Sequence, residues 1–347
     1  MAKRIVYLDW LRVIATVMVV VIHISAGMIS INYFDGRSSW LATNFYEAIS
    51  RMSVPLFVMI SGALLLNNQR EIKYRSFLNK TLSKIFIPLL GWSIIYYMYQ
   101  VYVANWYANF SVKEFFQLFL ANNISVHFWF MYMILGLYLT VPVIKIYIRG
   151  AEKKDLQYFL LLWLYASVLV KFTKFYFGYS LNLELFHVTN YIGYFILGYY
   201  LSTLQLKKAY IKEAFIIMFI GMSATFLLTY FSTVNNNGQL QEFWYEYLSP
   251  NVLLSAVGSF WLIKGIASTL KKQTLPLGLN LISTFSFGIY LVHMLVIMVF
   301  ADSVIPFLRN TFHSAVSVPL ITIFVLIVSV IITYVFSKIP VIKRFVP

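Results

Sequence analysis

Ten long apolar stretches separated by polar segments constrain the fold of this chain more than any other feature. Most of them are long enough for a helix to cross a hydrocarbon core of about 30 Å at about 1.5 Å per residue. We therefore expect an all-α polytopic membrane helix bundle with about ten transmembrane helices. The stretches lie approximately at residues 7–31, 48–67, 85–104, 127–148, 156–173, 189–204, 212–232, 249–269, 284–302 and 316–337.

Composition excludes an ordinary soluble domain. The chain is 61% hydrophobic and only 11% charged, whereas soluble domains contain about 25% charged residues. It has no cysteine, which excludes a disulfide, a thiol nucleophile and an acyl-cysteine intermediate. We find no low-complexity tail and no clear internal repeat, so we expect one membrane-embedded domain over residues 1–347 and no soluble domain.

The basic residues alternate between the connecting segments. Of the 27 Lys and Arg residues, 20 lie in the segments on one side of the predicted membrane, beginning with Lys3 and Arg4. The positive-inside rule assigns that side to the cytoplasm, places both termini there and requires an even number of spans. Most of these lysines are explained by topology and by contact with anionic lipid. The alternation also argues against nucleic acid as the partner of a chain with a net charge of +15.

The first apolar stretch places its polar and small residues on one helical face. The spacings are 3 or 4 residues throughout, which gives a single narrow stripe on a helix. Charged residues inside a membrane are costly and usually face a bundle interior, where they mark a pathway or a site. The stripe consists of Asp9, Arg12, Thr16, Val20, His23, Gly27 and Ser30.

Two residues of this stripe are candidates for chemistry. Arg12 and His23 are 11 residues apart, about 16 Å along the helix axis, and Asp9 is close enough to pair with Arg12. With the N-terminus inside, Arg12 is near the cytoplasmic edge and could meet an anionic ligand. His23 lies slightly beyond the midplane, where a neutral imidazole can act as a general base or a nucleophile. The alternative is an interfacial Asp9–Arg12 ion pair with a packed core histidine.

The second stretch and the segment that follows it supply further candidates. Arg51 is expected at the outer rim, a kink at Pro55, and the small pair Ser61-Gly62 in the inner half, where packing alone also explains it. The basic segment before the third stretch is suited to a multiply phosphorylated cofactor such as coenzyme A. Its candidate residues are Arg75, Lys80 and Lys84.

Histidines begin or interrupt two later stretches. His127, in His127-Phe-Trp129-Phe, is expected at the outer face, and His293 near the middle of the ninth stretch. Each could instead be a structural histidine bonded to a neighbouring helix. No pair of histidines has the spacing of a metal site. Acidic residues are nearly absent from the predicted spans, which argues against a cation-coupled transporter.

At these residues the chain resembles the acyltransferase-three family, polytopic membrane enzymes that modify cell-envelope glycans. The first sequence motif of the family is an Arg and a His separated by ten residues, and Arg12 and His23 match it here. The family has arginines before the third span, whereas Lys80 and Lys84 occupy that region here and lack the bidentate fork of arginine. Further similar blocks are Arg51-x-x-Val-Pro-Leu-Phe-x-x-x-Ser61-Gly62, His127-Phe-Trp-Phe, Gly193-Tyr-Phe-Ile-Leu-Gly198-Tyr-Tyr-Leu201 and Gly288-Ile-Tyr-Leu-Val-His293.

The resemblance implies an O-acetyltransferase-type enzyme in the bacterial cytoplasmic membrane. It would move an acyl group, usually acetyl, from cytoplasmic acyl-CoA to a hydroxyl of an envelope carbohydrate or glycolipid, without a metal. His23 would be the general base or, as a second route, carry the acyl group, while Arg12 would anchor the donor and Asp9 would orient Arg12. The expected donor-binding residues are Arg75, Lys80, Lys84 and Ser61, and the expected acceptor-binding residues are Arg51, His127, Trp129 and His293.

Two other functions fit the same pattern of spans. A transporter or flippase for a glycan or a lipid-linked sugar would also need about ten spans, a polar stripe and outward aromatic residues. A purely structural membrane subunit would leave the stripe unexplained. Hydrolysis or transfer of acyl-CoA by the purified protein separates an enzyme from a transporter.

Overall fold

The structure, a computed structural model, is an all-helical bundle in the part of the chain that it describes. It describes residues 5–30, 33–68, 73–181, 183, 185–205, 210–270 and 274–346. Lys3 and Arg4 lie outside these residues, and the predicted location of both termini in the cytoplasm stays a prediction. The chain is a multi-pass membrane protein, because eight helices in the described ranges are long and apolar enough to cross a bilayer, or nine if one bent pair counts as a span.

The first half of the chain supplies four of these spans. Helix α1 (Val6–Ile29) is followed by α2 (Arg37–Ser50) and α3 (Ser53–Leu66), which form one span, Arg37–Leu66. Helix α4 (Tyr74–Thr81), a π-helical turn (Leu82–Phe86) and α5 (Ile87–Tyr102) form the next. A surface helix, α6 (Val112–Leu120), then leads to α7 (Trp129–Gly150).

The second half contains four spans and several shorter helices. Helix α8 (Lys153–Trp163), a π-helical turn (Leu164–Leu169) and α9 (Val170–Phe177) form one span. Helices α11 (Ile211–Asn235), α12 (Pro250–Thr269) and α16 (Ser314–Lys338) belong to the other three. The shorter helices are α10 (Ile192–Thr203), α13 (Leu277–Thr284), α14 (Ser286–Val299) and α15 (Val304–Thr311).

Two of the ten expected spans are not among the eight helices in the described residues that are long enough to cross a bilayer. The stretch expected at 189–204 forms α10, whose 12 residues extend only about 18 Å. Its end is held by Lys264 of α12, whose amine donates hydrogen bonds to the carbonyls of Leu201, Ser202 and Leu204 at 2.6–2.8 Å. The stretch expected at 284–302 is the second arm of a pair, α13 and α14, bent by 83°.

The second span is longer than expected, and its break is displaced. The predicted apolar stretch at 48–67 excluded most of α2, because the polar residues of this helix lower its hydropathy. The expected kink at Pro55 lies instead at Arg51 and Met52, between the two helices. Proline has no N–H to donate to the carbonyl four residues earlier, here that of Arg51, so the helix is interrupted on that side of Pro55.

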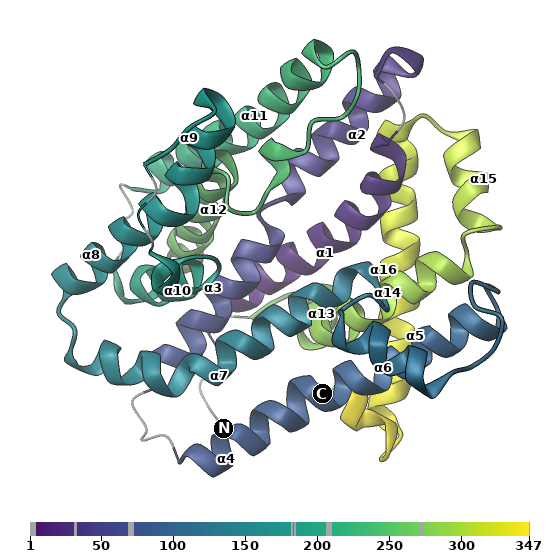
Figure 1. Cartoon of the computed structure of the whole chain (residues 1–347), viewed down its shortest axis with the longest axis horizontal. Helices are drawn as coiled ribbons and strands as arrows, with labels where there is room; N and C mark the ends of the chain where they lie inside the picture. Colours follow the sequence, from purple (N-terminus) through teal and green to yellow (C-terminus); the bar gives the residue numbers. More distant parts are fainter. Residues whose placement is uncertain are drawn as a thin grey trace.

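Helix α1 is the central element of the bundle (Figure 1). It contacts α2 and α3 on one side and α12, α13, α14 and α16 elsewhere around its circumference. Helices α3 and α10 also pack closely, because each presents a glycine to the backbone of the other. A Cβ on Gly62 would lie 1.8 Å from the Phe195 carbonyl oxygen, and one on Gly198 would lie 2.1 Å from that of Met59.

Candidate active site

Three cavities with common walls lead from α4 toward the middle of α1. The largest, the mouth cavity, measures about 610 Å³ and lies between α4, α7 and the end of α3. The middle cavity, about 270 Å³, shares Lys84 and Tyr138 with it. The histidine cavity, about 30 Å³, shares Phe57 and Tyr290 with the middle cavity. The three therefore lie in series.

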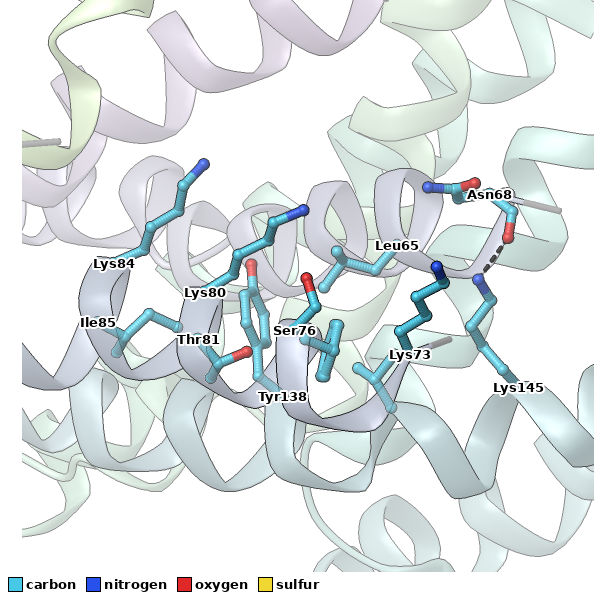
Figure 2. A pocket seen from close by; sticks show the side chains of 12 residues that line it. Leu65, Asn68, Lys73, Ser76, Lys80, Thr81, Lys84, Ile85, Tyr138 and Lys145 are labelled. Atoms are coloured by element: carbon cyan, nitrogen blue, oxygen red, sulfur yellow. Dashed lines mark hydrogen bonds between the residues drawn. The ribbon is translucent and has the colours of Figure 1, made fainter. Parts of the chain in front are cut away.

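Four lysines line the mouth cavity. Lys73 and Lys80 belong to the start and the body of α4, Lys84 to the π-helical turn, and Lys145 to α7. Figure 2 shows Lys80 and Lys84 projecting from the same side of their helix, with the Tyr138 ring beside them. Lys145 donates a hydrogen bond to the Asn68 carbonyl. The mouth cavity therefore concentrates positive charge at one end of the series.

The position of Lys84 follows from the local sequence. Pro88 has no N–H to close a hydrogen bond to the Lys84 carbonyl, and the helix widens into a π turn at Leu82–Phe86. Such turns are frequent at functional sites. Lys84 consequently lines both the mouth cavity and the middle cavity. Arg75, the other predicted donor ligand, lies instead on a neighbouring open hollow of about 540 Å³ that Lys80 also lines.

The middle cavity contains Arg12 and Ser61, both expected on the donor side. Arg12 donates to Asp9 at 2.7 Å, which confirms the predicted pairing. Ser283 donates to the same carboxylate oxygen at 3.2 Å, so Asp9 is held from α13 as well as from α1. The Tyr138 hydroxyl donates to Ser61 Oγ at 3.2 Å. The cavity thus has a fixed guanidinium at one wall and two hydroxyls at another.

Three histidines from three helical segments meet beside the smallest cavity. The His23 ring centroid is 5.1 Å from that of His293 and 6.2 Å from that of His127, and the latter two are 5.2 Å apart. His127 and His293 are fully buried, while His23 is partly exposed and lines the cavity. In the described residues, no group of His, Cys, Asp or Glu has an arrangement that could hold a metal ion.

The two buried histidines are anchored through Nδ1. His293 Nδ1 lies 2.7 Å from the Tyr290 carbonyl oxygen and 3.2 Å from that of Ile289. A carbonyl only accepts, so this nitrogen carries the proton. His127 Nδ1 is 2.9 Å from Ser125 Oγ. The Nε2 atoms of both rings are buried without a hydrogen-bond partner among the described residues.

Aromatic rings form another wall of the histidine cavity. Trp129 stacks on Tyr247 with ring centroids 5.5 Å apart and planes at 26°, and both line the cavity. Both residues are half-buried, and aromatic faces of this kind can also receive the apolar face of a pyranose ring. Trp129, predicted as an acceptor residue, therefore lies on the same cavity as His23 and His127.

Arg51 has a different environment from the expected outer rim. It lies at the break in the middle of the Arg37–Leu66 span, and its guanidinium is 2.8 Å from Glu47, which is fully buried. The same guanidinium is 4.4 Å from the Tyr245 ring centroid, and the Tyr245 hydroxyl donates to Asn44 Oδ1 at 2.5 Å. A buried charge needs such partners. Arg51 lines none of the three cavities.

Several site residues were missed from the sequence. Lys73 and Lys145 were assigned to topology alone, and Tyr138, Tyr247 and Tyr290 are among many tyrosines in the chain. Glu47 was overlooked because the expected span began at residue 48. Its position four residues before Arg51 was the available signal, since that spacing favours an ion pair on a helix.

The comparison with known families agrees with this geometry. The family model described as "Acyltransferase domain" matches residues 5–338. The chain belongs to the acyltransferase-three family. The resemblance carried by the motifs around Arg12, Arg51, His127 and His293 is thereby confirmed. No curated protein and no solved structure matches the chain.

Proposed function

We propose that this acyltransferase-family protein moves an acyl group, acetyl in the first instance, from acyl-CoA to a hydroxyl of a cell-envelope carbohydrate or glycolipid. The observation that supports this proposal best is the row of cavities. It begins at four lysines, passes Arg12 and ends at His23. A long donor with phosphates at one end and a reactive thioester at the other matches that order of charges and sizes.

The mouth cavity is the proposed site of the coenzyme A phosphates. The alternation of basic residues supports a cytoplasmic location for this cavity, on the side where acyl-CoA is made. Lys80 and Lys84 are exposed and form no ion pair in the described part of the chain, so their charges are available to an anion. The pantetheine arm would occupy the middle cavity, with Arg12 and Ser61 as its polar neighbours.

His23 is the proposed general base. It takes the proton of the acceptor hydroxyl, whose oxygen attacks the thioester carbonyl. The carbon–sulfur bond then breaks, and the departing thiolate takes the proton from His23 to leave as the free thiol. General-base help of this kind typically contributes about 10²–10⁴-fold. A covalent acyl-His23 intermediate is the second route.

The acceptor is proposed to approach along the stacked pair Trp129 and Tyr247. Arg51 would influence acceptor binding indirectly, because its positive charge interacts with Tyr247. His127 lines the histidine cavity and would contact the reacting hydroxyl. The narrowness of this cavity, about 30 Å³, favours the meeting of two small reacting groups over the passage of a glycan.

Purified protein in detergent or nanodiscs provides the test. With radiolabelled acetyl-CoA and an envelope glycan fraction, we expect label in the glycan and release of free thiol. His23→Ala should lower the rate at least about 100-fold. His187→Ala, in an exposed 3-10 turn, should leave the rate unchanged. Glycan transport across sealed vesicles without acyl-CoA consumption would refute the enzyme and support the transporter.

A further inference from the structure

His293 occupies a position that the proposed chemistry does not yet explain. It was expected to bind the acceptor, but its side chain is fully buried and lines none of the three cavities. A group in that position cannot touch the acceptor or the thioester. It lies behind His23, on α14, which packs against α1.

The hydrogen bonding of His293 determines what it can offer. Because its Nδ1 carries a proton toward the Tyr290 and Ile289 carbonyls, a neutral ring has its lone pair on Nε2. That Nε2 is buried and has no partner among the described residues. A buried acceptor without a donor is destabilising, so a nearby N–H is needed to satisfy it.

Two rings are close enough to provide that N–H. The His127 ring centroid lies 5.2 Å from that of His293, and His127 is held at Nδ1 by Ser125 while its Nε2 also lacks a partner among the described residues. The His23 ring centroid lies 5.1 Å from that of His293. His23 has no hydrogen bond among the described residues, and it is the ring to which the proposed chemistry assigns the proton transfer. Catalytic hydrogen bonds are often long in structures without substrate and shorten when substrate binds.

We propose that His293 is a positioning residue whose Nε2 accepts the ring N–H of His23. This rests on the proposed role of His23 as a base. With one nitrogen of His23 bound to His293, the other presents its lone pair to the cavity and to the acceptor hydroxyl. When His23 takes the proton, the resulting imidazolium has two N–H groups, and His293 accepts one of them. The proton returns to the thiolate through the cavity-facing nitrogen, so His293 undergoes no net change.

Substitutions that keep or remove an acceptor at the Nε2 position provide the kinetic test. The amide of Gln reaches about as far as His Nε2, whereas that of Asn reaches only about as far as Nδ1. His293→Phe and His293→Asn should therefore lower kcat by about 10–100-fold, as expected for a misplaced catalytic group, with KM for acyl-CoA unchanged. His293→Gln should recover most of the rate.

A double-mutant comparison separates positioning from a general structural role. If His293 acts through His23, adding His293→Phe to His23→Ala should cause no further loss, because residues that act as a unit are non-additive. Thermal unfolding of each variant provides the folding control. A multiplied loss, a raised KM for the acceptor, or wild-type rates in His293→Phe would each overturn the proposal.

A spectroscopic measurement keeps the inference independent of activity. In protein labelled with ¹⁵N-histidine in bilayers, His23→Ala identifies the His23 signals. We expect one tautomer of His23 in the wild type and a mixture in His293→Phe, with His127→Phe leaving His23 in a single tautomer. If only His127→Phe changes the tautomer of His23, the ring that accepts its N–H is His127 and not His293. The proposal then fails whether or not the enzyme transfers acetyl. Absence of acyl transfer with the expected tautomers would refute the proposed function alone.

Discussion

Replacing Lys80 and Lys84 together by glutamine should weaken donor binding without changing the chemical step. Both line the mouth cavity, and both are exposed. An exposed charge pair is worth about 0.2–1 kcal/mol, so two contacts to phosphate contribute about 0.4–2 kcal/mol. At about 1.4 kcal/mol per tenfold, KM for acyl-CoA should rise roughly 2–30-fold. Because this binding is the same in the ground and transition states, kcat should stay unchanged.

Steady-state kinetics with acyl-CoA varied at saturating acceptor measures this effect. The effect should shrink between about 0.1 M and 1 M salt, where the screening length falls from about 10 Å to about 3 Å. It should also vanish with an acyl-pantetheine donor, which has no phosphates. Lys153→Gln/Lys154→Gln is the matched control, since these lysines line none of the described cavities. An equal rise in the control, or an effect confined to the KM of the acceptor, would show that the donor enters elsewhere.

Three further predictions concern the donor anchor, the packing and the topology. Arg12→Lys keeps the charge but loses the planar fork, so affinity for acyl-CoA measured by calorimetry should fall; unchanged affinity and rate would leave Arg12 as a helix anchor only. Gly62→Ala should destabilise the protein by about 1–3 kcal/mol in thermal unfolding, because its Cβ would strike the Phe195 carbonyl, whereas Gly136→Ala, with no atom within 4 Å, should not. Reporter fusions after residues 35, 75, 110 and 150 should lie outside, inside, outside and inside the cell in that order. Two neighbouring fusions on the same side would contradict this topology.

The features predicted well from sequence are those set by local geometry. Helix α1 and the Asp9–Arg12 pair follow from a 3.6-residue period and an i, i+3 spacing, which are properties of a single helix. The multi-pass architecture follows in the same way from the length and apolarity of each segment. Neither inference needs knowledge of which helices are neighbours.

The features that could not be predicted depend on contacts between distant segments. Hydropathy identifies the apolar stretch of α10, but not that the helix has only 12 residues or that Lys264 from α12 binds the carbonyls at its end. Glu47 is acceptable inside a span only because Arg51, one helical turn away, neutralises it. A hydropathy average over a sequence window is lowered by both of these polar residues. The prediction therefore excluded α2, the helix that contains Glu47.

The convergence of the histidines is the clearest case of this limit. His23, His127 and His293 are each ambiguous alone, because a lone membrane histidine is explained as well by packing as by catalysis. Their meeting requires α1, α14 and the 3-10 turn Val126–Phe128 before α7 to be adjacent, which no spacing in the sequence encodes. Once they are together, access to the cavity divides them: His23 and His127 line the cavity, whereas His293 does not. This division supports one histidine as the reacting group and another as its support.

The uninterrupted helix α1 connects the two ends of the proposed reaction. Arg12 lines the middle cavity and His23 the histidine cavity, and about 16 Å of rigid helix separates them. The walls opposite come from α3, α7 and α14, and two of these helices begin at a break: α3 begins after the turn at Arg51, and α14 begins after an 83° bend. In the proposed reaction, α1 would keep the donor anchor Arg12 and the base His23 at a fixed separation. This separation would hold the thioester at one depth relative to His23 in the proposed transfer to a hydroxyl.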